Sequence, residues 1–173
     1  MEVILVDAND QEIGVMEKME AHKKGALHRA FSVFIFNEQG EMLIHQRAMQ
    51  KYHNGGLWTN ACCSHPMRGE QTIHAASRRL KEEMGIITEL VTAFSFTYKA
   101  EFDNGLIENE FDHVFIGTHS GEINPDPAEV QAYTFKSMKE ISQKLTSHPG
   151  DFTIWFRLAF PRVEALDLKK ELH

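Results

Sequence analysis

Alternation of apolar and polar positions along the chain predicts a sheet of several strands. The clearest alternation spans residues 89–99, where Phe94, Phe96 and Tyr98 recur at every second position, and another follows at 110–118. Runs rich in β-forming residues and bounded by turn signals predict further strands at 2–7, 12–16, 30–36, 42–47 and 130–135. We expect 30–36 and 42–47 to form a hairpin around the turn at 37–40.

A second periodicity, of helical spacing, follows the middle of the chain. Ile73, Ala76, Leu80 and Met84 form one apolar stripe, with Thr72 expected as N-cap and Gly85 as the left-handed residue that ends the helix. Further helices are expected at 137–145 and 152–168, and the polar stretch 17–28 is a loop or a short helix. Strands mixed with three helices predict an α+β or α/β sandwich, and the length of 173 residues is most simply one domain, 1–173.

Composition narrows the class of protein. The net charge of -7 argues against a nucleic-acid-binding protein, which usually carries a basic face. Cys62 and Cys63 are the only cysteines and are adjacent, so we expect free thiols and a reducing, cytoplasmic location. We find neither a signal peptide nor an apolar run long enough to cross a membrane.

Residues capable of chemistry recur at strand spacing. Side chains at positions i and i+2 of a strand share a face, so Cys63 should lie beside His65, and Glu108 beside Glu110. We expect His65, together with a nearby metal, to favour the Cys63 thiolate and Cys62 to pack on the opposite face. With His22 and His28, these groups suit a Zn, Mn or Mg ion, without a sharp choice among them. A solvated acidic strand end is the simpler alternative for the two glutamates.

The segment 64–86, SHPMRGEQTIHAASRRLKEEMGI, resembles a degenerate Nudix box. Two positions depart from the family pattern: Ser64 replaces a glycine, and Arg79 replaces a metal-binding glutamate. The matching positions are Glu70, Arg78, Leu80, Glu82, Glu83, Gly85 and Ile86. With WTNACCSHP, FTYKA and IENE, residues 19–155 resemble the type I isopentenyl-diphosphate isomerases, which have the Nudix fold.

This resemblance implies a Nudix-like α/β/α sandwich with a mixed sheet, and an enzyme that interconverts isopentenyl and dimethylallyl diphosphate. Cys63 would carry proton transfer on one face of the substrate, and Glu110 with Tyr98 on the other. The implied partner is a small isoprenoid diphosphate, and the oligomeric state stays open. The implied metal ligands are His22, His28, His65, Glu108 and Glu110, for Mg, Mn or Zn. Glu83 would hold a Mg²⁺ that arrives with the diphosphate, and the implied substrate-binding residues are Lys18, Arg47, Lys51, Arg79 and Trp155.

Two other functions remain open at this point. One is a Nudix hydrolase of nucleoside or isoprenoid diphosphates, which the box favours and Arg79 opposes. The other is a Nudix-like binding module without catalysis, which would leave the thiol and the His/Glu set without a role. Separately, ring packing is the simpler alternative for Tyr98 and Trp155, and pairing with Glu83 on the helix is the simpler alternative for Arg79. The remaining histidines are expected to be ordinary surface or core residues: His45, His53, His74, His113, His119, His148 and His173.

Overall fold

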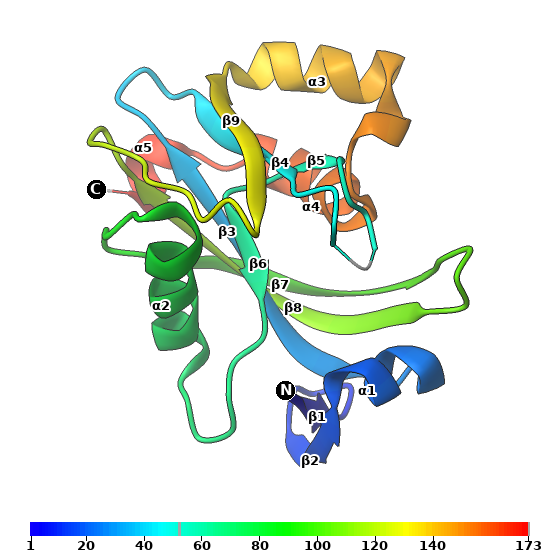
Figure 1. The fold of residues 1–173 in the computed structure, drawn as a ribbon. Helices are drawn as coiled ribbons and strands as arrows, with labels where there is room; N and C mark the ends of the chain where they lie inside the picture. Colours follow the sequence, from blue (N-terminus) through cyan, green and yellow to red (C-terminus); the bar gives the residue numbers. More distant parts are fainter. Residues whose placement is uncertain (52, 173) are drawn as a thin grey trace.

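The computed structural model describes residues 1–51 and 53–172, and its centre is a nine-stranded sheet (Figure 1). The strands are β1 (Glu2–Val6), β2 (Glu12–Glu17), β3 (His28–Phe36), β4 (Met42–Arg47), β5 (Trp58–Thr59), β6 (Cys62–Ser64), β7 (Val91–Glu101), β8 (Ile107–Thr118) and β9 (Val130–Lys136). The helices are α1 (Lys18–Lys24), α2 (Thr72–Met84), α3 (Met138–Ser147), the 3₁₀ turn Pro149–Asp151, α4 (Ile154–Glu164) and α5 (Leu168–Glu171).

Strand β3 is the centre of this sheet. It pairs in parallel with β8 along its whole length, from His28↔Glu110 to Phe36↔Thr118, and antiparallel with β6. Strand β8 in turn pairs antiparallel with β7. Parallel and antiparallel neighbours on one strand make the sheet mixed, as expected.

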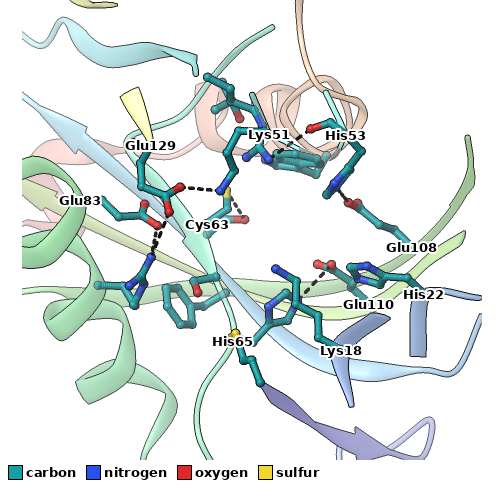
Figure 2. Close-up of a pocket in the computed structure, with 18 of the residues that line it drawn as sticks. Lys18, His22, Lys51, His53, Cys63, His65, Glu83, Glu108, Glu110 and Glu129 are labelled. Atoms are coloured by element: carbon teal, nitrogen blue, oxygen red, sulfur yellow. Dashed lines mark hydrogen bonds and ion pairs between the residues drawn. The ribbon is translucent and has the colours of Figure 1, made fainter. Parts of the chain in front are cut away.

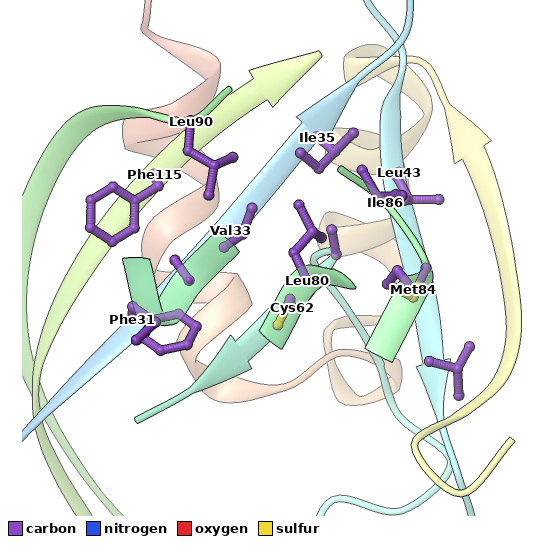
Figure 3. Packing of buried hydrophobic residues seen from close by; sticks show 14 residues of the cluster. Phe31, Val33, Ile35, Leu43, Cys62, Leu80, Met84, Ile86, Leu90 and Phe115 are labelled. Atoms are coloured by element: carbon purple, nitrogen blue, oxygen red, sulfur yellow. The ribbon is translucent and has the colours of Figure 1, made fainter. Parts of the chain in front are cut away.

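The two faces of the sheet are covered by different helices, because successive strand residues point to opposite faces. On one face Phe31, Val33 and Ile35 pack with Leu80 and Met84 of α2 (Figure 3). On the other face Phe34, Phe36 and Val114 pack with Trp155, Phe156 and Phe160 of α4. The α/β/α sandwich is therefore confirmed.

The expected hairpin of 30–36 with 42–47 forms only at its turn. Strand β4 contacts β3 through the single pair Phe36↔Met42, and its ladder partners are β9 and β5. The physical reason is that β6 and β8 already occupy both hydrogen-bonding edges of β3. Strand β4 therefore leaves β3 after the turn and pairs with segments far along the chain.

The helix expectations hold with small corrections. Helix α2 begins at Thr72 with Gln71 as N-cap, so the cap expected at Thr72 is wrong by one residue. Gly85 ends α2 at φ 68°, as expected, and a Cβ atom there would lie 2.9 Å from the Asn124 carbonyl oxygen. The polar stretch 17–28 contains helix α1. The expected helix at 152–168 is two helices, because α4 stops at Glu164 and Asp167 caps a new one.

Candidate active site

A pocket of about 320 Å³ opens beside the central strands and gathers the residues singled out by sequence (Figure 2). Its lining includes Lys18, His22, Arg47, Lys51, Cys63, His65, Arg79, Glu83, Tyr98, Glu108, Glu110 and Trp155. His28 does not line the pocket but is fully buried beside it, with its ring centroid 5.0 Å from that of His65. Helix α1, strands β6 to β8 and helices α2 and α4 thus converge at one place.

The register of the sheet explains this convergence. Glu110 on β8 lies opposite His28 on β3 and Tyr98 on β7, and Cys63 on β6 lies opposite Ser32 on β3. His28 and Ser32 are four residues apart on one strand, so they face the same side. The two i, i+2 pairs recognised in the sequence are thereby brought to one face of the sheet.

Four of the proposed metal ligands form a compact, buried group. Ligand atoms of His22, His28, His65 and Glu110 all lie within 4.8 Å of one another. Burial, followed by the neighbouring histidines, lowers the pKa of His22 to about 3, and burial lowers that of His65 to about 4. Both imidazoles are therefore neutral near pH 7, which is the form that binds a metal.

The hydrogen bonds of this group test whether a cation fits. Nδ1 of His28 lies 2.9 Å from the carbonyl oxygen of Ala26 and donates to it, so the ring presents the lone pair of Nε2 to the cluster. That Nε2 faces Oε1 of Glu110 at 3.5 Å, and Nε2 of His65 faces the same oxygen at 3.4 Å. Neither nitrogen has a hydrogen-bond partner, although both are buried. A cation between these two nitrogens and the Glu110 oxygen would give all three atoms a partner. The residues therefore fit a divalent ion.

The surroundings of Glu110 and Tyr98 shift their pKa values in opposite directions. Burial opposes ionisation of Glu110, but its contacts with His28 and His65 keep its pKa well below the usual value. Burial also opposes protonation of His28, yet the Glu110 carboxylate raises the pKa of His28. Burial and the charges of Glu110 and Glu108 raise the pKa of Tyr98. Tyr98 therefore keeps its hydroxyl hydrogen and shares it between Glu108 at 2.8 Å and Glu110 at 3.0 Å.

Glu108 lies beside Glu110 but outside the compact group of four. Its Oε1 contacts Nε2 of His53, a residue for which the sequence predicted no role. His53 stands in the loop between β4 and β5, and no periodic pattern marks it. A histidine two residues after Lys51 in a Gly-rich loop was the only signal that the sequence offered.

Cys63 presents a neutral thiol to the pocket. Its Sγ lies 3.1 Å from Oδ1 of Asn60 and 3.5 Å from Oγ of Ser32, and Ser32 donates to the buried Asp112 at 2.7 Å. Burial, followed by the charge of Asp112, raises the pKa of Cys63. The contacts with Ser32 and Asn60 act in the opposite direction but do not outweigh burial, so the protein groups around Cys63 favour its neutral form. Stabilisation of the thiolate by His65 together with a metal stays a prediction.

Cys62 points away from Cys63, as expected, and is fully buried in the cluster beneath α2. Its Sγ donates to Oε2 of Glu83 at 3.1 Å. Arg79 contacts the other oxygen of Glu83 at 2.6 Å and Oε2 of Glu82 at 2.5 Å. Arg79 therefore makes the helix pairing that the sequence left open, and its guanidinium also lines the pocket.

The remaining cations come from the end of β4, the loop that follows it, and α1. Nζ of Lys51 lies 2.5 Å from Glu129, and the guanidinium carbon of Arg47 lies 5.3 Å from the ring centroid of Trp155. Lys18, at the start of α1, lines the same pocket, and burial lowers its pKa. Several cationic side chains on one small pocket make it suited to a ligand with several negative charges.

The other histidines fall into three situations. His45 is buried and lines the pocket, and burial lowers its pKa to about 4. His113 lies 2.8 Å from Asp10, outside the pocket residues. His74 and His148 are exposed, as expected, and His119 is half-buried. His173 lies outside the described residues.

Comparison with a family model and with curated relatives identifies the family of this chain. The family model of the NUDIX domain matches residues 26–156. Among curated relatives, the Isopentenyl-diphosphate Delta-isomerase of Pectobacterium atrosepticum is 53% identical, with 94% of this chain and 90% of the relative covered. The protein of that name from Serratia proteamaculans is 48% identical, with coverage of 89% and 86%. The chain belongs to the NUDIX domain family and, within it, to the isopentenyl-diphosphate Delta-isomerases.

Solved structures agree on the fold. A Deinococcus radiodurans protein superposes with a TM-score of 0.71 at 14% identity, covering 86% of this chain and 90% of that one. The MutT protein of Methanosarcina mazei gives 0.64 at 21% identity, covering 80% and 93%. Within residues 1–51 and 53–172, none of the helices has the length and apolarity required to span a membrane.

Proposed function

We propose that the protein interconverts isopentenyl diphosphate and dimethylallyl diphosphate, an activity that matches the name of its relatives. The observation that carries the proposal is the pairing of two proton-transfer groups in one pocket. The Cys63 thiol stands on β6, and the Glu110 carboxylate with its Tyr98 partner stands on β8 and β7. The same pocket holds cations suited to a diphosphate.

The chemistry requires one acid and one base. Moving the double bond adds a proton at C4, forms a tertiary cation at C3, and removes a proton from C2. In the resting protein Cys63 is the protonated group and Glu110 is the ionised group, so the pocket begins with both. After one turnover a proton has moved from one group to the other, and exchange with solvent or reverse reaction restores the starting state.

The walls of the pocket must exclude water, which would trap the cation at C3. Trp155 and Phe31 are both buried and line the pocket, so both supply apolar surface. We propose that Lys18, Arg47, Lys51 and Arg79 hold the diphosphate at the polar end. Diphosphate binding there would place the hydrocarbon end against Trp155, whose ring face attracts a positive charge.

We propose that His22, His28, His65 and Glu110 hold a divalent ion, Zn, Mn or Mg, with Glu108 as a further ligand. When bound, such an ion supplies a fixed positive charge that tunes the proton affinity of the carboxylates. Glu83 is the proposed ligand of a Mg²⁺ that accompanies the diphosphate. The free thiols of Cys62 and Cys63 favour a cytoplasmic location.

The decisive experiment is incubation of the purified protein with isopentenyl diphosphate and Mg²⁺, followed by separation of the products. Isomerisation is expected, and the Cys63→Ala variant should form much less dimethylallyl diphosphate. Release of phosphate faster than isomerisation would instead identify a hydrolase. Unchanged substrate would indicate a binding module.

A further inference from the structure

His53 and Glu108 make a contact between two walls of the pocket that are far apart in sequence. His53 belongs to the loop 48–57, and Glu108 belongs to β8. The side chains are 7% and 5% exposed, so the contact is enclosed by protein. An enclosed contact between imidazole and carboxylate is stronger than one in water, because solvent screens it less.

The described residues of the loop 48–57 have a tightly constrained backbone. Its ends are tied by hydrogen bonds from Arg47 N to Leu57 O at 2.8 Å and from Gly56 N to Arg47 O at 2.9 Å. Asn54 and Gly56 have φ of 56° and 81°. A Cβ atom on Gly55 would lie 2.6 Å from the Met49 carbonyl oxygen. The backbone therefore folds tightly on itself and requires glycine at this point.

Two proposed diphosphate-binding cations depend on this loop. Lys51 is part of it, and Arg47 at its entrance donates from Nη2 to the carbonyl oxygen of His53 at 3.4 Å. The wall opposite is the proton-transfer side, since Glu108 also accepts from Tyr98 at 2.8 Å. Through the pair His53–Glu108, the wall that binds the diphosphate is attached to the wall that carries Tyr98 and Glu110 (Figure 2).

We infer that His53 is a positioning residue that fastens the loop 48–57 to β8 and thereby holds Lys51 and Arg47 in place for the diphosphate. The inference rests on the proposed function, because it assigns these cations to a diphosphate ligand. The role of His53 is distinct from that of a metal ligand, because His53 acts through Glu108 and through the backbone of its own loop. Loss of the contact frees the loop, and the two cations then lose their fixed positions.

Two variants isolate the contact from the packing of the ring. His53→Phe keeps an aromatic ring beside Phe102, whose centroid lies 5.3 Å from that of His53, and removes the nitrogen. His53→Gln keeps a hydrogen-bond donor. His113→Gln is the matched control, since His113 also pairs with a carboxylate, Asp10 at 2.8 Å, but away from the pocket.

The measurements are calorimetric binding of inorganic pyrophosphate, calorimetric binding of Zn²⁺, amide hydrogen exchange of the segment 48–57, and KM and kcat with isopentenyl diphosphate. His53→Phe should weaken pyrophosphate binding about tenfold, raise KM more than it lowers kcat, and speed exchange in the loop. His53→Gln should recover most of each effect, and His113→Gln should change none. Because His53 contacts the proposed ligand Glu108, affinity for Zn²⁺ should fall by no more than about 10- to 100-fold in His53→Phe and should stay the same in His113→Gln.

Unchanged pyrophosphate binding and exchange in His53→Phe would overturn the inference. Complete loss of Zn²⁺ binding in that variant would also overturn it, because His53 would then be a metal ligand itself. Failure of the proposed function is separate: a wild-type protein that neither binds pyrophosphate nor isomerises the substrate refutes that function. Slow exchange of the loop that depends on His53 would still be measured in such a protein.

Discussion

The two adjacent cysteines provide the sharpest test of the proposed chemistry, because they differ by one position and face opposite sides of β6. Cys63→Ala removes a thiol that lines the pocket, and Cys62→Ala removes one that is fully buried and bonded to Glu83. We expect Cys63→Ala to lower turnover by at least ~100-fold, the scale of a general acid or base. Its effect on the free energy of unfolding should be small, since Cys63 is only half-buried.

For Cys62→Ala we expect a loss of stability with little loss of turnover. The substitution leaves a small void and removes one donor from a charged group, which together cost about 2 kcal/mol of unfolding free energy. For a chain of this size that corresponds to a fall in Tm of roughly 4–8 °C. Turnover per folded molecule should stay close to the wild-type value.

The assay combines initial rates at saturating isopentenyl diphosphate with thermal unfolding followed by circular dichroism. Rates are divided by the fraction of folded protein at the assay temperature. Equal losses of turnover in the two variants would refute the assignment of proton transfer to Cys63. So would a Cys63→Ala protein that keeps a tenth or more of the activity.

Three further outcomes are expected. Removing divalent ions should abolish turnover and lower Tm, and adding Zn²⁺, Mn²⁺ or Mg²⁺ should restore both. Calorimetry should show weaker binding of the divalent ion at about pH 5.5 than at about pH 7.5. The reason is that the pKa of His28 is raised, so at the lower pH its ring holds a proton that competes with the ion. Arg79→Ala should weaken pyrophosphate binding roughly 10- to 150-fold without creating phosphatase activity, and an unchanged affinity would show that Arg79 serves only the helix. The pKa of buried His45 is lowered to about 4; protonation therefore favours the unfolded chain, and the unfolding free energy should fall by up to about 3 kcal/mol as pH drops from about 6.5 to about 4. His45→Gln should flatten that part of a urea-denaturation profile, and an unaltered slope would contradict this reading.

Local periodicity was sufficient to predict most elements and one face of the site. The spacing of two along β6 and β8 correctly placed Cys63 opposite to Cys62, and Glu108 beside Glu110. It could not predict which strands pair, because the parallel ladder of β3 with β8 joins residues more than eighty positions apart. Chain proximity favoured β4 as the partner of β3, but the two strands pair only at Phe36↔Met42, and β4 pairs along its length with β9.

The protonation state of the thiol depends on residues that the sequence does not link to it. Asp112 reaches Cys63 only through Ser32 and the register of β3 with β8 and β6. Yet a signal was present: Glu108, Glu110 and Asp112 continue one alternation, so a third carboxylate on that face follows from the same rule. His53 had no such signal, since a loop has no periodicity and its partner lies 55 residues away.

The position of Arg79 connects the box helix to the choice between isomerisation and hydrolysis. A carboxylate at this position would add to Glu82 and Glu83 and attract a metal able to activate water. Arginine instead places a permanent positive charge against both acids, at 2.5 and 2.6 Å, so the helix neutralises its own carboxylates. A diphosphate that draws the guanidinium away leaves Glu83 as a buried carboxylate without its cation. Such a group is costly unless a new positive charge arrives, and a Mg²⁺ carried by the diphosphate meets that need. In the proposed function this exchange would bind the diphosphate through its oxygens. Arg79 would then stand where a carboxylate could hold a metal that activates water, which suits an isomerase that must preserve the P–O–P bond.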